Sequence, residues 1–245
     1  MTEFDHEDVV EQILIGLDVK DLIRCKSVCK SWHSLITSPG FINRHLNYSY
    51  HKDRCSNELN NRRISYTHLV GSSNGLICII SALYAKILVC NPLTREVRKL
   101  ALLIGLSFCW GFGYDSSGDD YKVFMGSKKG KNLTCVQVLS LKSNVWRVIG
   151  EVKYKFISID GILCNGALHW IIRDENMKKI IISYDLSKEE FKEIPHPVDA
   201  RYKCTSSSYL GILKNCLCIF SRSHYPSVHV WLMKNYNVKQ SWELV

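Results

Sequence analysis

The segment DGILCNGALHWII, residues 160–172, consists of two short apolar runs joined by Asn165-Gly166. Asn-Gly is the strongest two-residue signal for a β-hairpin, because both central residues of the favoured turn need a positive φ. Three similar hairpins are HLVGSSNGLICII (68–80), WGFGYDSSGDDYKVFMG (110–126) and LGILKNCLCIF (210–220). Their turns recur about every 45 residues, which indicates a repeated structural unit.

Each hairpin is followed by a third strand, a short polar turn and a fourth strand. These pairs are KILVCN with EVRKL, LTCVQVLSL with VWRVIG, KIIISYDL with FKEIP, and VHVWLM with QSWELV. Four strands per unit at this period are typical of a β-propeller blade. An all-β sandwich with evenly spaced strands is the alternative. The constant order of hairpin, longer loop and hairpin favours the propeller.

The first 46 residues have helical periodicity instead. Apolar residues form one run of Val9, Val10, Ile13, Leu14 and Leu17, and a second of Leu22, Cys25, Val28, Cys29, Trp32, Leu35 and Ile36. Asp5 and Asp18 can cap a helix on each run, and Ser38-Pro39 ends the second helix. A polar, Asn-rich linker, residues 47–65, separates this segment from the strands.

The composition argues against a disordered chain, a membrane-spanning protein and a disulfide-rich secreted protein. Of 245 residues 46% are hydrophobic, which is enough for a core, and there is no apolar run of the ~18 residues that a membrane span needs. The acidic N-terminus does not resemble a secretory signal. Eleven cysteines, an odd number, are scattered without CxxC pairs or zinc spacing. They favour reduced, unligated thiols in the cytosol or nucleus, and no cofactor is expected.

Two sets of motifs carry a family resemblance. The first is ILIGLDVKDLIRCKSVCKSWHSLITSPGF (13–41), and the second is GSSNGLICI, NPLTRE, GFGYDSSGDDYKV, SLKSNVWR, NGALHW, SYDLSKEEFKEIP and the closing run from VWLMK to SWEL. Residues 4–46 thereby resemble an F-box, and residues 66–245 resemble the F-box-associated domain of the large plant F-box families. The family's usual Leu-Pro start is replaced by Glu3-Phe4-Asp5, and its domain usually continues past Ser241-Trp242.

This resemblance implies an α+β protein, in which a small helical F-box precedes an all-β, propeller-like domain of about four four-stranded blades. We expect a shortened copy of that domain and hence an incomplete ring. By the same resemblance the F-box binds a Skp-family adaptor, and through it a cullin and a RING subunit, while the β-domain binds an unknown target protein. No nucleic acid or membrane partner is expected.

The exposed helical stripe supports an adaptor interface, because about 45 residues cannot bury two apolar stripes by themselves. The residues expected at or near it are Leu14, Leu17, Val19, Leu22, Cys25, Lys26, Val28, Lys30 and Trp32. Inward packing of Trp32, Leu35 and Ile36, within the F-box or against the β-domain, is the alternative.

Target recognition is expected in the loops of the β-domain. Basic residues there are Lys128, Lys129, Lys131, Lys178, Lys179, Arg201 and Lys203. One interpretation is that these residues bind an acidic or phosphorylated target. The alternative is that they are scattered surface charges that keep the protein hydrated and have no common ligand. The sequence does not indicate a catalytic site. His169 lies within a strand, where a structural role is expected. Asp119-Asp120 lies in a hairpin turn, where carboxylates commonly cap backbone amides. There is no GxSxG, P-loop or HExxH motif.

The leading interpretation is the substrate receptor of an SCF-type ubiquitin ligase, which makes no bond itself. Three alternatives remain: a degenerate F-box protein that serves only as an interaction module, a nucleic-acid-binding protein that uses the basic body of a chain with net charge +9, and a propeller enzyme. The aromatic residues lie within strands at core spacing, which counts against nucleic-acid binding.

Overall fold

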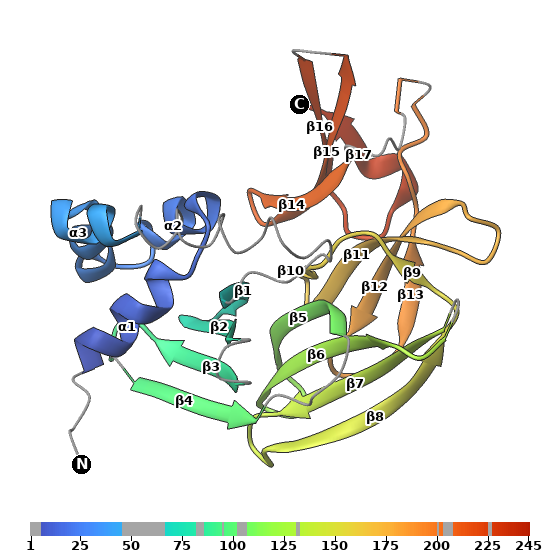
Figure 1. Cartoon of the computed structure of the whole chain (residues 1–245). Coiled ribbons are helices and arrows are strands. Elements are labelled where there is room, and N and C mark those ends of the chain that lie inside the picture. Colours follow the sequence, from blue (N-terminus) through green and yellow to red (C-terminus); the bar gives the residue numbers. More distant parts are fainter. Residues whose placement is uncertain are drawn as a thin grey trace. The chain divides into compact units, whose positions relative to one another are not determined.

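The computed structural model describes residues 6–45, 67–81, 86–94, 96–101, 107–130, 133–199, 201–202, 208–224 and 227–245. The chain divides into two compact units, Met1–Ile104 and Gly105–Val245. The first unit contains the N-terminal helices and one sheet, and the second contains three sheets (Figure 1). The predicted cap Asp5, the predicted linker 47–65, and Lys131 and Lys203 lie outside the described residues.

The N-terminal helices match the first apolar run, whereas the second run is divided between two shorter helices. The helices are α1 (His6–Ile15), α2 (Val19–Cys25) and α3 (Lys30–Thr37), and residues 39–45 are also helical. Asp18 caps α2 as predicted, since its Oδ1 accepts a hydrogen bond from the Asp21 amide at 2.9 Å. The single helix predicted over the second run is wrong, because residues 26–29 turn the chain between α2 and α3.

Local hydrogen bonds explain this break. Ser27 Oγ donates to the Arg24 carbonyl at 2.7 Å and so competes with a further helical turn. Cys29 has an extended backbone, and its Sγ accepts from the Trp32 amide at 3.5 Å, so the thiol caps α3. Because the three- and four-residue apolar spacing continues across the turn, periodicity alone does not reveal it.

The sheet of the first unit is antiparallel, with the strand order β1-β2-β3-β4. Its strands are β1 (Thr67–Ser73), β2 (Leu76–Ser81), β3 (Lys86–Asn91) and β4 (Glu96–Ala101). Strand alternation puts Ile77, Ile79, Leu88 and Cys90 on one face, where they form one buried cluster with residues of the N-terminal helices. The helices therefore cover that face of the sheet (Figure 1).

The second unit contains three antiparallel sheets that follow one another along the chain. Their strands are β5 (Ser107–Asp115), β6 (Asp120–Lys128), β7 (Thr134–Ser140) and β8 (Val145–Val152); β9 (Lys155–Phe156), β10 (Ile162–Cys164), β11 (Ala167–Arg173), β12 (Lys179–Asp185) and β13 (Phe191–Ile194); and β14 (Tyr209–Leu213), β15 (Cys216–His224), β16 (Ser227–Met233) and β17 (Trp242–Leu244). The short strand β9, which pairs with β11, is an addition that the repeat did not predict.

Three of the four predicted hairpin turns have the expected backbone. Both residues have positive φ at Asn74-Gly75, at Asn165-Gly166 and at Lys214-Asn215. The turn predicted at Ser117-Gly118 is instead a four-residue loop, 116–119, and its positive φ is at Asp119. The carboxylate of Asp115 accepts two backbone amides of this loop, which makes the longer turn stable.

The three sheets of the second unit pack face to face. One buried cluster joins β5–β7 to β11 and β12 around Phe124 and Trp170, and another joins β11–β13 to β14–β17 around Ile181 and Trp231. The first packing depends on two glycines of β5. A Cβ at Gly111 would lie 2.6 Å from Leu168, and one at Gly113 would lie 2.6 Å from Leu186.

The structure thus confirms the predicted order of an N-terminal helical segment followed by four repeated antiparallel sheets. Each sheet contains a meander of four strands with a hairpin at its start, as the repeat requires, and the sheet β9–β13 has β9 as a fifth strand. The incomplete ring expected from the sequence stays a prediction.

Candidate functional site

The structure divides the nine expected adaptor-binding residues into two groups. Leu14, Leu17, Leu22, Cys25 and Trp32 are buried, Lys26 is half-buried, and Val19, Val28 and Lys30 are exposed. The buried group belongs to the cluster shared with the first sheet, so its members are interior residues of this unit. The accessible part of the expected set is therefore Val19, Lys26, Val28 and Lys30.

An additional residue extends the accessible apolar part. Ile23 is 62% exposed and lies one helical turn after Val19, which is 63% exposed. Residues four apart lie on the same side of a helix, so these two form an apolar strip along α2. Val28 is exposed in the turn after α2. Ile23 lies off the long apolar stripe and was therefore not among the expected residues, although its four-residue spacing from Val19 indicates a shared side of the helix.

The thiol of Cys25 lies in the interior, on the opposite side of α2 from this strip. Burial raises its pKa to about 12, and Asp21 and Cys90 add to that effect. The pKa of Cys90, which belongs to the first sheet, is also raised to about 12 by burial. These thiols are therefore protonated at neutral pH and serve as small core residues.

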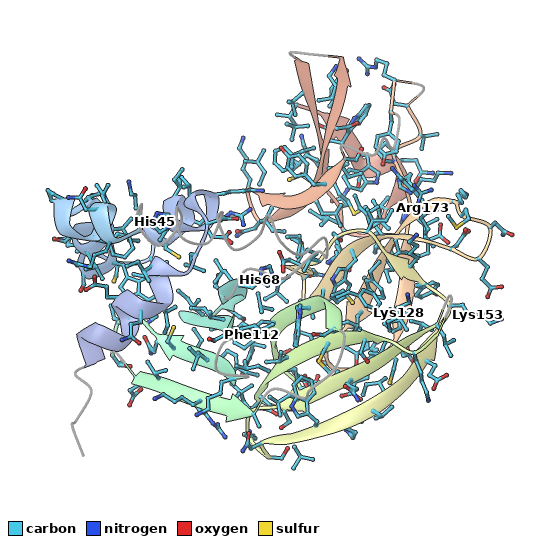
Figure 2. The ribbon with its side chains drawn as sticks, in the orientation of Figure 1. His45, His68, Phe112, Lys128, Lys153 and Arg173 are labelled. Atoms are coloured by element: carbon cyan, nitrogen blue, oxygen red, sulfur yellow. The ribbon has the colours of Figure 1, made fainter. Side chains whose placement is uncertain are left out.

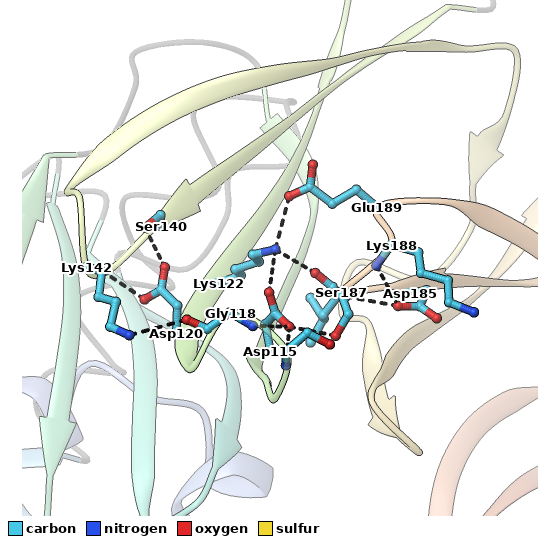
Figure 3. Close-up of polar contacts among 12 residues, drawn as sticks. Asp115, Gly118, Asp120, Lys122, Ser140, Lys142, Asp185, Ser187, Lys188 and Glu189 are labelled. Carbon is cyan, nitrogen blue, oxygen red and sulfur yellow. Dashed lines mark hydrogen bonds and ion pairs between the residues drawn. The ribbon is translucent and has the colours of Figure 1, made fainter.

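A polar network in the second unit is the other dense group of charges (Figure 3). Lys122 Nζ lies 2.9 Å from Asp115 Oδ2 and 3.1 Å from Glu189 Oε1, and it donates to the Leu186 carbonyl at 2.6 Å. Ser187 Oγ donates to the other oxygen of Asp115 at 2.6 Å. All three protons of the ammonium group have acceptors, so Lys122 is a structural residue that has no donor left for a ligand.

Hydrogen bonds and burial act in opposite directions on the pKa values of the two carboxyl groups in this network, Asp115 and Glu189. Burial alone would raise the pKa of Asp115, but hydrogen bonds from Lys122 and Ser187 lower it to about 2. Burial also opposes the ionisation of Glu189, and hydrogen bonds from Arg147 and Lys122 nevertheless lower its pKa. Both carboxylates are therefore ionised at neutral pH, and neither is suited to act as a general acid.

His169 is fully buried and has two partners. Its Nδ1 lies 3.0 Å from the Ile162 carbonyl, and its Nε2 lies 2.8 Å from the Tyr236 hydroxyl. A carbonyl can only accept, so the proton of the neutral ring is on Nδ1 and Nε2 accepts from Tyr236. Burial lowers the pKa of His169 to about 4. The residue is a neutral link between β11 and the segment after β16.

The carboxylates of Asp119 and Asp120 are also used within the fold. Asp119 accepts from the Tyr114 hydroxyl at 2.6 Å and pairs with Lys142 at 3.1 Å. Asp120 accepts from Ser140 and from the Lys142 amide, at 2.9 Å in the second case. Within the part of the chain that the structure describes, no group of three or more His, Cys, Asp or Glu could hold a metal ion.

The basic loop residues differ in their pairing. Lys129 pairs with Glu151, and Arg201 pairs with Asp199 at 2.5 Å, whereas Lys128 and Lys178 are exposed without an ion pair among the described residues. The described helices include none long and apolar enough to cross a bilayer.

Comparison with known families assigns both parts of the chain. Residues 6–44 match the F-box domain, and residues 36–245 match the F-box associated beta propeller domain. The second match covers most of the chain.

Proteins of Arabidopsis thaliana that are similar to this chain are also F-box proteins. The chain is 29% identical to the F-box/kelch-repeat protein At3g23880, covering 96% of this chain and 77% of that protein. It is 28% identical to F-box protein At3g07870, covering 96% and 70%, and 30% identical to F-box protein CPR1, covering 97% and 71%. TolB from Acinetobacter baumannii has a TM-score of 0.46 at 12% identity over 72% of this chain and 43% of its own, a likeness too weak to bear on this fold.

Proposed function

The chain belongs to the family of F-box proteins with an F-box-associated β-propeller domain, and from this membership we propose that it is the substrate receptor of an SCF-type ubiquitin ligase. In this role the F-box binds a Skp-family adaptor, which joins it to cullin and RING subunits, and the β-domain binds the target protein. The receptor makes no bond itself. It raises the effective concentration of the target near the ubiquitin-loaded enzyme, in the cytosol or the nucleus.

One observation supports an adaptor surface, namely the apolar strip on α2. Val19 and Ile23 are each more than 60% exposed, and the exposed Val28 follows them. Lys26 and Lys30 flank Val28 in sequence and supply polar groups at the edge. Apolar side chains at helical spacing with a polar rim are typical of a helix-binding interface. We propose that the adaptor contacts this strip, and that Leu14, Leu17, Leu22, Cys25 and Trp32 support it from beneath.

The test is co-purification of the full chain with a Skp-family adaptor. Val19→Asp with Ile23→Asp should weaken adaptor binding about tenfold or more, because two charges would face an apolar partner surface. Both side chains are exposed, so the melting temperature should change little. Leu93→Asp is the matched control, since Leu93 is 85% exposed in the β3–β4 turn of the same unit. Equal recovery of adaptor by the double variant would refute this surface.

A degenerate F-box protein that acts only as an interaction module is the second candidate. It is favoured by the departure from the family's usual Leu-Pro start at Glu3-Phe4-Asp5. The same experiment separates the two candidates, because such a protein would not recover the adaptor in its parent form. Nucleic-acid binding is less well supported, because Tyr209 is the only exposed aromatic side chain among the described residues.

A further inference from the structure

Three cations lie directly opposite one another at one end of the sheet β9–β13. Arg173 of β11 is the register partner of Lys155 in β9 and of Lys179 in β12. Directly opposite residues of antiparallel strands point to the same face, with Cβ atoms about 4.5–5.5 Å apart. These three residues, here called the cationic row, therefore project side by side from three adjacent strands. Figure 2 labels Arg173.

Nearby carboxylates are committed to other partners. Glu175 pairs with Lys153 at 3.4 Å, and Asp174, which follows Arg173 in sequence, accepts the Lys178 amide at 2.8 Å. Within the described ranges, no ion pair involves any member of the cationic row. Among the described residues the Arg173 side chain makes one hydrogen bond, to the Met177 carbonyl at 3.3 Å, and most of its guanidinium donors have no partner there.

This arrangement brings three like charges together, and among the described residues none of them has a countercharge. Like charges placed directly opposite each other in a sheet are destabilising. Lys155 is exposed and the other two side chains are half-buried, so their repulsion is screened only in part. The neighbouring positions Phe156, Ile172 and Ile180 are buried and hold the three strands in register. The row is therefore a rigid, preformed concentration of positive charge.

We propose that the cationic row binds a phosphorylated side chain of a partner protein. A phosphoryl group carries about −1.5 to −2 charges and three strong acceptor oxygens, which matches three adjacent cations. The central position of Arg173 suits bidentate contact with two of these oxygens, and the lysines can contact the third. This proposal rests on the proposed function, in which the β-domain recognises the target, and it names the chemistry of that recognition.

The surroundings favour a protein phosphate over a nucleic acid. A groove for single-stranded nucleic acid needs exposed aromatic side chains on which bases stack. The one exposed aromatic residue of the described chain, Tyr209, lies in β14 of another sheet and stacks on Phe220. The row is also only three residues wide, which fits one phosphoryl group and not a continuous phosphate backbone.

The experiment uses the full chain and three pools of fluorescent nonapeptides, with serine, phosphoserine or glutamate at the centre of mixed residues. Fluorescence anisotropy should show at least about tenfold tighter binding of the phosphoserine pool than of the serine pool, because charge-assisted hydrogen bonds are the strong ones. Inorganic phosphate should compete. The row variant combines Lys155→Gln, Arg173→Gln and Lys179→Gln. It should lose the preference for phosphoserine over serine. Its melting temperature should be unchanged or higher, because the repulsion between the three cations is removed.

The matched control is Lys188→Gln, Lys192→Gln and Lys214→Gln combined. These lysines are exposed in the same unit, and the change of net charge is the same. The control should keep the phosphoserine preference. Equal loss in both triple variants would mean unspecific attraction to a basic protein and would overturn the proposal. It would also be overturned if the glutamate pool bound as tightly as the phosphoserine pool, or if a uridine oligonucleotide bound tighter and displaced the phosphopeptide.

Failure of this proposal is distinct from failure of the proposed function. The row variant and its control should both recover the Skp-family adaptor as well as the parent does, because the substitutions lie in β9, β11 and β12. A protein that binds phosphopeptide but not adaptor would refute the ligase role alone.

Discussion

His169 is a buried polar residue whose contacts specify both its tautomer and its charge. Its ring accepts from Tyr236 and donates to the Ile162 carbonyl, and it has no room for hydration. Its place in a strand predicts a structural role. The contacts add a quantitative consequence, because a group that stays neutral in the folded state makes stability depend on pH.

Stability should therefore fall as the pH falls below 6.5. The pKa of His169 is about 4 in the folded state, against an ordinary value of 6.5, so the unfolded chain binds more protons between these values. The contribution is complete above pH 6.5 and is lost progressively down to about pH 4, up to about 3 kcal/mol in all. Urea unfolding at several pH values should show this slope in the parent.

The variant His169→Gln isolates this contribution. It should be less stable than the parent at pH 7.5, because a buried hydrogen bond is altered, but its free energy of unfolding should depend less on pH between 6.5 and 4. His33→Gln is the control, since His33 is exposed in α3 and its replacement should leave the parent's slope. Parallel pH profiles for the parent and His169→Gln would contradict the prediction.

At the scale of elements, a polar contact between two turns joins the sheet β5–β8 to the sheet β9–β13, in addition to their shared apolar cluster. The loop after β5 and the turn after β12 come from segments about 70 residues apart, and Lys122 bridges them through Asp115 and Glu189 (Figure 3). The family motif GFGYDSSGDDYKV contains both glycines that allow the close packing, together with Asp115 and Lys122. One motif thus supplies the packing surface and the charges of the same contact.

Lys122→Met should be strongly destabilising. It leaves the Asp115 carboxylate buried without its cation, and breaking a buried pair by removing one partner costs about 3–5 kcal/mol. Lys142→Met is the matched control, because its pair with Asp119 is exposed to solvent and should contribute far less to stability than the buried pair. Urea unfolding of the full chain measures both. Equal losses of stability in the two variants would show that the bridge is no more than a surface pair.

At the scale of the whole molecule, the F-box helices and the first sheet share one core. Leu14, Leu17 and Trp32 are in the same buried cluster as Ile79 and residues of β3. The F-box and the F-box-associated domain are therefore not separate at their boundary, because the first repeated sheet also completes the core of the helical segment. A core mutation in that sheet should affect the helices.

Two neighbouring isoleucines of β2 test this. Ile79 and Ile80 are both buried, but they point to opposite faces, and of the two only Ile79 belongs to the helix cluster. Each change to alanine should cost about 2–5 kcal/mol. Hydrogen exchange should nevertheless show faster exchange in α1–α3 for Ile79→Ala than for Ile80→Ala, with weaker adaptor recovery. Equal exchange of the helices in the two variants would disprove the shared core.

Much of this organisation could be predicted from local pattern. Asn74-Gly75 and Asn165-Gly166 specify two-residue turns through their own backbone preferences, and alternating apolar residues specify strands on either side. The cap at Asp18 is equally local. The break at Cys29 was missed because a thiol is not a usual cap, and the loop at 116–119 was missed because the Asp115 side chain selects the longer turn.

The candidate sites could be predicted from local sequence pattern only in part. Helical spacing identifies which residues share a stripe, but it cannot say whether the stripe faces a partner or the same chain. Burial of Trp32 and exposure of Ile23 depend on a sheet that begins only at Thr67. The cationic row is similar, since Lys155, Arg173 and Lys179 are spread along the sequence.

The sequence by itself determined the repeat, three of its four hairpin turns, the helical start and the family, because these depend on near neighbours and on motif order. Tertiary structure alone decided which face of the helices is free, that Lys122 is fully paired, and that three cations stand opposite one another. The physical reason is that strand register and burial are set by contacts between distant segments. Local preference limits the conformation of each segment, whereas the packing of segments against one another selects the surface that is left for partners.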